Sequence, residues 1–261
     1  MWISRLCVQF LFYSFVGWIY ETIFCMVRRR RWENRGFLFG PICPIYGVGA
    51  VTVTLLISFL PTSGALASPW AVFFISMFGS AVLEYATSWT LERLFHAIWW
   101  DYSNLPLNLH GRISLFSSIG FGCAGVLIVF VVAPYMEGIS GLLPAIWAEF
   151  LSLLGIAILA ADLTLTVSAL TDFAARVYRL EDSMNGHMDH LVDSAWQKAA
   201  DAKDFVLTGS EQVRARLETM SRTSQLALRR VESFRFPGLE SERIHAALKE
   251  LRERFQNRLD K

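Results

Sequence analysis

Long apolar runs separated by short polar segments make up the first two-thirds of the chain. A helix needs about 20 apolar residues to cross the hydrocarbon core of a bilayer. Five runs reach that length, at residues 5–27, 40–60, 70–92, 113–134 and 143–171. They predict an all-α fold, a polytopic helix bundle of about five membrane spans, and they place a transmembrane domain at residues 1–172.

The basic residues of this region lie almost entirely in alternate connections. The first connection contains Arg28, Arg29, Arg30, Arg31 and Arg35, and the third contains Arg93 and Arg112, whereas 61–69 and 135–142 contain no Lys or Arg. Cytoplasmic loops of membrane proteins carry an excess of Lys and Arg. We therefore expect the N-terminus outside, and both basic connections and the C-terminal tail in the cytoplasm. The first run does not match a cleaved signal peptide, because its basic cluster follows the apolar stretch.

The last third of the chain, residues 173–261, predicts a separate helical domain. It holds sixteen of the 24 basic residues and fourteen of the 23 acidic ones, so we expect no binding of nucleic acid. Small and apolar residues recur four and three apart at Val213, Leu217, Met220, Ser224, Ala227, Val231 and Phe234, and again after "FPG" from Ile244 to Phe255. This spacing predicts a cytoplasmic helical or coiled-coil tail that packs on itself or on a partner.

Three carboxyl groups fall inside the predicted spans. Glu21, Glu84 and Asp162 lie six, eight and nine residues before the predicted ends of their spans. At 1.5 Å per residue, each is roughly 9–14 Å inside the cytoplasmic boundary. Ionisable groups in a bilayer are costly and are functional candidates by default. The shared depth predicts a common polar site, and the alternative is that each group is only ion-paired or hydrogen-bonded in the structure.

A cluster of glycine and proline opens the second run. Asn34, Arg35 and Gly36 precede Gly40, Pro41, Pro44 and Gly47. Proline fits the first turn of a helix, so the second span is expected to begin late, near residue 44, or to enter the membrane as a broken segment. Free backbone N–H groups at such a start form an anion site, to which Arg35 and Arg112 would add charge. The alternative is a tight loop between two spans.

The third connection combines aromatic and polar residues in "HAIWWDYSNLPLNLHGR" (96–112). Trp and Tyr are typical of membrane interfaces. Asp101 and Arg112 are predicted to form a salt bridge, and the loop could cover a cavity facing the cytoplasm. The four cysteines show no CxxC or Cys–His spacing, so they predict apolar packing, and no catalytic or metal-ligand motif stands out.

Several motifs together resemble one known family. "FYSFVGWIYETIFC" (12–25), "NRGFLFGPICPIYGVG" (34–49), "LEY" (83–85) and "WDYSNLPLNLHGR" (100–112) resemble the signature blocks of the CmpB-like ABC-transporter type IV family. The resemblance covers about the first four spans and implies a polytopic protein of the bacterial inner membrane that acts as a transporter permease. The matching family positions are Glu21, Asn34, Arg35, Gly36, Gly40, Pro41, Pro44, Tyr46, Gly47, Glu84, Trp100, Asp101, Tyr102, Gly111 and Arg112.

Three functions remain open from the sequence. The first is a permease-like component of a transporter, which would need a separate ATPase subunit and a homodimer or heteromer, since the sequence contains no GxxxxGK[ST]. The second is a membrane protein that binds or modifies an anionic lipid headgroup. The third is a scaffold or sensor that acts through its tail. We expect no cofactor and no metal, and a protein that is not an enzyme is favoured.

Overall fold

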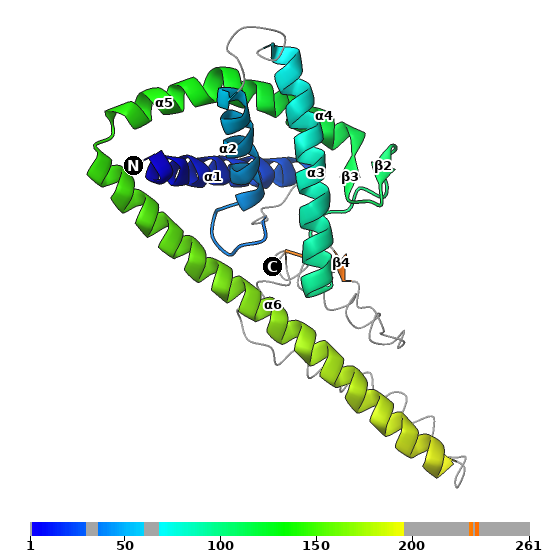
Figure 1. Ribbon diagram of the computed structural model, residues 1–261. Coiled ribbons are helices and arrows are strands. Elements are labelled where there is room, and N and C mark those ends of the chain that lie inside the picture. The colour runs from blue at the N-terminus through cyan, green and yellow to red at the C-terminus, as the bar shows by residue number, and fades with distance from the viewer. Residues whose placement is uncertain (1, 30–35, 60–67, 196–229, 232, 235–261) are drawn as a thin grey trace.

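The computed structural model describes residues 2–29, 36–59, 68–195, 230–231 and 233–234 (Figure 1). Its helices are α1 (Trp2–Arg29), α2 (Pro44–Phe59), α3 (Pro69–Phe95), α4 (Leu115–Leu127), α5 (Ala133–Leu142) and α6 (Ala145–Ala195), with a π-helical turn, η2 (Ile128–Val132), between α4 and α5. The predicted helical fold is confirmed. It also contains two short antiparallel strand pairs that the pattern did not predict: β1 (Ala97–Ile98) with β4 (Ser233–Phe234), and β2 (Asn108–Leu109) with β3 (Ile113–Ser114).

Four helical stretches in the described part of the chain are long and apolar enough to cross a membrane. They are Trp2–Val27, Pro69–Phe95, Leu115–Ile139 and Ala145–Tyr178. The predicted span 40–60 forms α2, whose 16 residues extend over only about 24 Å, so the five predicted spans are not confirmed. Large apolar side chains point outward along these helices, among them Trp70 at 74% and Leu153 at 73% exposure. An apolar surface of this extent matches a membrane environment, so the chain is a membrane protein.

Helix α2 begins at Pro44, as the sequence predicts. The chain before it is held by a hydrogen bond from the Cys43 N–H to the Ser14 carbonyl of α1, at 3.0 Å. Two glycines then let the helices approach closely. A Cβ on Gly17 would collide with the Tyr46 ring, and one on Gly47 would collide with Ser14. Small residues at helix contacts are a common feature of packing within membranes. The close contact fixes how α2 is turned against α1.

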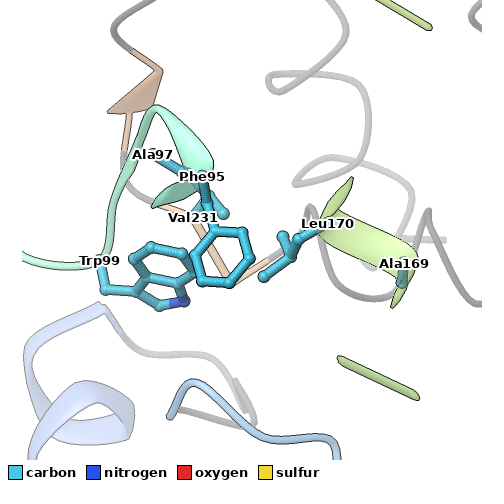
Figure 2. Packing of buried hydrophobic residues seen from close by; sticks show 6 residues of the cluster. All are labelled: Phe95, Ala97, Trp99, Ala169, Leu170 and Val231. Atoms are coloured by element: carbon cyan, nitrogen blue, oxygen red, sulfur yellow. The ribbon is translucent and has the colours of Figure 1, made fainter. Parts of the chain in front are cut away.

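A buried apolar cluster lies where α3 ends and β1 begins. Its fully buried members are Phe95, Ala97, Trp99, Ala169, Leu170 and Val231 (Figure 2). Phe37 and Phe39, from the chain before α2, pack against it. The cluster thus joins α3, α6, the 36–43 loop and a residue from the C-terminal tail. We call residues 36–43 and 96–114, which meet here, the loop end of the bundle.

The tail differs from the predicted coiled coil where the structure describes it. Val231 and Phe234, the last two positions of the predicted heptad seam, are not helical. Val231 is buried in the apolar cluster of the membrane domain, and the backbone of Phe234 pairs with Ala97 in the strand pair of β4 and β1. The rest of the seam lies outside the described residues. Helix α6 passes residue 172 without a break and continues away from the bundle (Figure 1), and the domain boundary there stays a prediction.

Candidate functional site

Glu21 of α1 is bound by a tyrosine of α2. The Tyr46 hydroxyl donates a hydrogen bond to Glu21 Oε1 at 2.5 Å. Tyr46 lies in the first turn of α2, and its ring occupies the space that Gly17, one turn before Glu21, leaves open. The ring also contacts Phe121 of α4, with centroids 5.7 Å apart. The late start of α2 and the glycine on α1 therefore place this hydroxyl at the carboxylate.

Glu84 of α3 is bound from the third connection and from α4. Its side chain is 4% exposed. The Tyr102 hydroxyl donates to Oε1 at 2.9 Å, and the Ser117 hydroxyl donates to Oε2 at a longer 3.5 Å. The backbone of Tyr102 is fixed by a hydrogen bond from its N–H to the Gly111 carbonyl, at 2.8 Å. Gly111 has φ +69°, a conformation that favours glycine, and a Cβ there would collide with Ser103.

These two pairs lie close enough to influence each other. Burial, and after it the Glu84 carboxylate, raise the pKa of the Tyr102 hydroxyl well above its ordinary range, and Glu21 adds to the rise. Tyr102 is therefore a hydrogen-bond donor at any physiological pH. We call Glu21, Tyr46, Glu84, Tyr102 and Ser117 the carboxylate–tyrosine cluster. It draws its members from α1, α2, α3, α4 and the third connection.

Asp162 of α6 lies in a second group, bound to the backbone of the glycine–proline loop. Its Oδ1 accepts from the Phe39 N–H at 2.8 Å, and its Oδ2 accepts from the Gly40 N–H at 2.7 Å. A Cβ on Gly40 would lie 2.8 Å from Oδ2, so a side chain there would push the carboxylate away from its present position. Thr166 also donates to Oδ1, at 3.3 Å. Two backbone N–H groups before α2 therefore bind a carboxylate of the same chain.

The other loop positions shape this segment. Gly36 has φ +125°, and its missing Cβ leaves room for Cys43 Sγ. Pro41 is exposed between Gly40 and α2, and Pro44 starts the helix. Burial raises the pKa of the Cys43 thiol to about 12, with Glu21 raising it further and Arg230 opposing the rise. The predicted site residues Asn34 and Arg35 lie outside the described residues.

Arg230, from the C-terminal tail, completes the second group. Its Nη2 donates to the Phe39 carbonyl at 2.8 Å, and its guanidinium lies over the Phe39 ring, 5.1 Å from the centroid. Burial lowers the pKa of the guanidinium to about 10, and the charge of Asp162 opposes that change. This contact could not be predicted from sequence, because Arg230 is one of many basic residues in the tail.

Arg112 and Asp101 do not form the predicted salt bridge. Arg112 Nη2 lies 2.5 Å from Glu92 Oε2, and Nη1 donates to Ser88 at 3.3 Å. Asp101 instead accepts from the N–H and the hydroxyl of Ser103. The prediction was wrong because an aspartate in a turn binds the backbone two residues on.

Both residues nevertheless line one small hollow at the loop end. Ser88, Glu92, Trp100 and His110 also line it. Its volume of about 10 Å³ is that of about one water molecule. The side chain of Arg112 therefore belongs to a third polar group, in which it binds Glu92 and Ser88.

The structure thus divides the predicted site. Glu21, Tyr46 and Glu84 come together, whereas Asp162 pairs with the glycine–proline loop. Tyr102 and Ser117 were not among the predicted binding residues, although Tyr102 lies in one of the quoted motifs. In the described parts of the chain, no group of three His, Cys, Asp or Glu side chains could hold a metal ion.

In a comparison with known proteins, a family model described as "Putative ABC-transporter type IV" matches residues 8–167, from within α1 through α5 and into α6, where it covers about two thirds of the apolar stretch Ala145–Tyr178. No curated protein and no solved structure matches the chain.

Proposed function

Since the chain belongs to the CmpB-like ABC-transporter type IV family, we propose that it is the permease-like membrane component of a transporter in the bacterial inner membrane. In this proposal the N-terminus lies outside and the tail is cytoplasmic. The carboxylate–tyrosine cluster then forms a polar site on the cytoplasmic side of the bundle. The basic connections 28–39 and 93–112 would face the same compartment.

The observation that carries the proposal is the cluster itself. Glu84 is buried at 4% exposure in a helix whose outer surface is apolar, and its two oxygens are bound by hydroxyls from two other elements. Glu21 adds a second carboxyl group nearby. Polar groups inside a membrane bundle are costly, so their collection at one place supports a pathway or binding site.

The chemistry of the cluster favours one class of solute. It contains two carboxyl groups, two phenols and one serine hydroxyl, and none of its members is basic. Carboxylates only accept hydrogen bonds, and phenols and serine can both donate and accept. A solute with positive charge or several hydrogen-bond donors therefore fits better than an anion. Energy from ATP would come from a separate ATPase subunit, and the complex would be a homodimer or heteromer.

The headgroup alternative rests on the carboxylates, the arginines and the chain before α2. In that chain, the N–H groups of Phe39 and Gly40 are bound to Asp162. An anionic headgroup would have to displace a carboxylate of the same chain. The scaffold or sensor alternative, by contrast, gains support from the tail segment that contacts the loop end.

The proposal is tested by purifying the protein gently from native membranes and identifying the proteins bound to it by mass spectrometry. We expect an ATPase subunit in fixed ratio. Recovery without any ATPase would contradict the permease role.

The cluster is tested by measuring ATP hydrolysis of that complex in lipid nanodiscs. Glu21→Gln and Glu84→Gln keep the shape of each side chain and remove its charge, and Glu149→Gln, at an exposed carboxyl group elsewhere in a span, is the matched control. We expect both cluster variants to lower the rate about tenfold or more and the control to leave it unchanged. Equal rates in all three variants would contradict the role of the cluster.

A further inference from the structure

Arg230, Val231 and strand β4 (Ser233–Phe234) lie far from the membrane domain in sequence but are bound to its loop end. We propose that the loop end is a docking site for this segment of the same chain, and that the docked segment acts as a latch on the loop at 36–43. Three independent contacts support docking: an apolar one, a polar one and a strand pair. The inference does not depend on the transport proposal.

The apolar contact is made by Val231. Its side chain is 1% exposed and packs among Phe95, Trp99 and Leu170 (Figure 2). The partners come from α3, the third connection and α6, so one tail residue fills a space bounded by three elements. Full burial of a valine contributes about 1.5–3 kcal/mol relative to its exposure.

The polar contact is made by Arg230. The loop at 36–43 is held on its N–H side by Asp162 and on its carbonyl side, at Phe39, by Arg230. Asp162 and Arg230 also attract each other across the loop, as the effect of Asp162 on the Arg230 pKa shows. The loop is therefore clamped between a helix of the membrane domain and the tail.

The strand pair sets the position of the segment. Ala97 is opposite Phe234 and Ile98 is opposite Ser233, in antiparallel register. Both residues of β1 are buried. Backbone pairing of this kind gives a defined direction, so the segment binds in one orientation.

The clamp has a consequence for the carboxylate–tyrosine cluster. The loop leads directly into α2, whose first turn carries Tyr46, the donor to Glu21. Release of the segment removes the Arg230 hydrogen bond and loosens the start of α2. Partners that bind the tail would thus act on the membrane domain through Arg230, Val231 and β4.

The docking is tested by disulfide crosslinking in the full chain. The four native cysteines are replaced by alanine, and Ile98→Cys is combined with Ser233→Cys. Opposite residues of an antiparallel pair lie about 4.5–5.5 Å apart between Cα atoms, within the range for a disulfide. A protease site inserted after Gly209 shows whether the tail fragment stays attached after cleavage.

We expect efficient attachment within one chain, and none for a control that combines Leu109→Cys on β2 with Ser233→Cys. Absence of attachment would overturn the proposal. So would a disulfide formed only between two coexpressed chains that carry one cysteine each, since the occupant would then be a second copy.

The latch is tested by the rate at which a maleimide modifies Cys43, in a chain whose other three cysteines are alanine. Cys43 is 4% exposed, so modification requires the loop to open. Loss of a buried hydrogen bond to a charged group corresponds to roughly a tenfold to hundredfold change in such an opening equilibrium. We expect that increase in rate for Arg230→Ala and a smaller one for Arg230→Lys.

Arg93→Ala is the control, because Arg93 also lies over an aromatic ring, that of Trp89, but is exposed on α3. Its Cys43 should react at the wild-type rate. An unchanged rate in Arg230→Ala would show that the docked segment does not hold the loop.

Discussion

Replacing Asp162 by asparagine is the most direct test of the second polar group. The two carboxylate oxygens accept from two successive N–H groups, at 2.8 and 2.7 Å. An asparagine of the same shape offers one oxygen and one NH₂ group. One N–H therefore keeps an acceptor, whereas the other faces a donor and loses its bond. The attraction between Asp162 and Arg230 disappears as well.

The expected loss follows from these contacts. A hydrogen bond to a charged group contributes about 1.5–3 kcal/mol, and a donor left without a partner adds a desolvation penalty. We expect the free energy of unfolding to fall by roughly 2–4 kcal/mol, since the site is only partly buried. For a chain of this size, each kcal/mol shifts Tm by about 2–4 °C, so Tm should fall by roughly 5–15 °C.

Thermal unfolding in detergent, followed by tryptophan fluorescence, measures this shift. The nine tryptophans provide a strong signal. Asp172→Asn is the matched control, because Asp172 is an exposed carboxyl group further along α6, and it should change Tm by no more than about 2 °C. An Asp162→Asn protein with the Tm of that control would refute the view that this carboxylate anchors the loop.

The remaining predictions concern packing, the cluster and pH. Gly47→Ala places a Cβ 2.6 Å from the Phe10 carbonyl and should lower the free energy of unfolding by about 1–3 kcal/mol. Gly120→Ala is the control, because a Cβ there lies in open space and should leave Tm equal or higher. Similar losses of stability in both variants would contradict the close contact at Gly47. A double-mutant cycle of Tyr46→Phe and Glu21→Gln should give a coupling free energy of unfolding of about 1 kcal/mol or more between the two side chains. Additive effects would show that their hydrogen bond does not stabilise the protein. Burial raises the pKa of the Cys43 thiol to about 12 in the folded protein. As pH rises above about 9, the thiol therefore loses its proton in the unfolded chain before it does in the folded one, and the free energy of unfolding falls. Cys43→Ala should lessen this fall in Tm between pH 8 and 10.5, and parallel curves would argue against a buried thiol.

The helices were predictable because their signal is local. Apolar length indicated the four long helical stretches, and the position of Pro44 indicated where α2 begins. Both depend on residues within one segment. Hydrophobicity also indicated α2 as a membrane segment, but its helix has 16 residues and is shorter than the predicted run.

The candidate site was only partly predictable, because depth does not determine direction. Glu21, Glu84 and Asp162 were expected at one level from their distances to the span ends. A helix turns by about 100° per residue, however, so depth leaves open which way each side chain points. Asp162 faces the loop at Phe39 and Gly40, whereas Glu84 faces Tyr102.

Nothing in the sequence distinguishes the residues that contact these carboxylates from similar residues beside them. Tyr102 lies beside Trp99 and Trp100, which look alike as interface residues in the sequence. Val231 continues a spacing typical of a helix, although it is buried in the membrane domain. The hydrogen bond from the Ser103 N–H to Asp101 could have been predicted, since it joins residues two apart in a turn.

The contact between Asp162 and the loop has a consequence for the evolution of this family. Its donors are backbone N–H groups, which every residue except proline supplies. A new side chain at position 39 cannot compensate for a substitution of Asp162, because only the backbone of residue 39 makes the contact. Position 40 is constrained to glycine, since a Cβ there would displace the carboxylate. In an alignment of relatives, this contact would therefore appear as two invariant columns and not as a correlated pair.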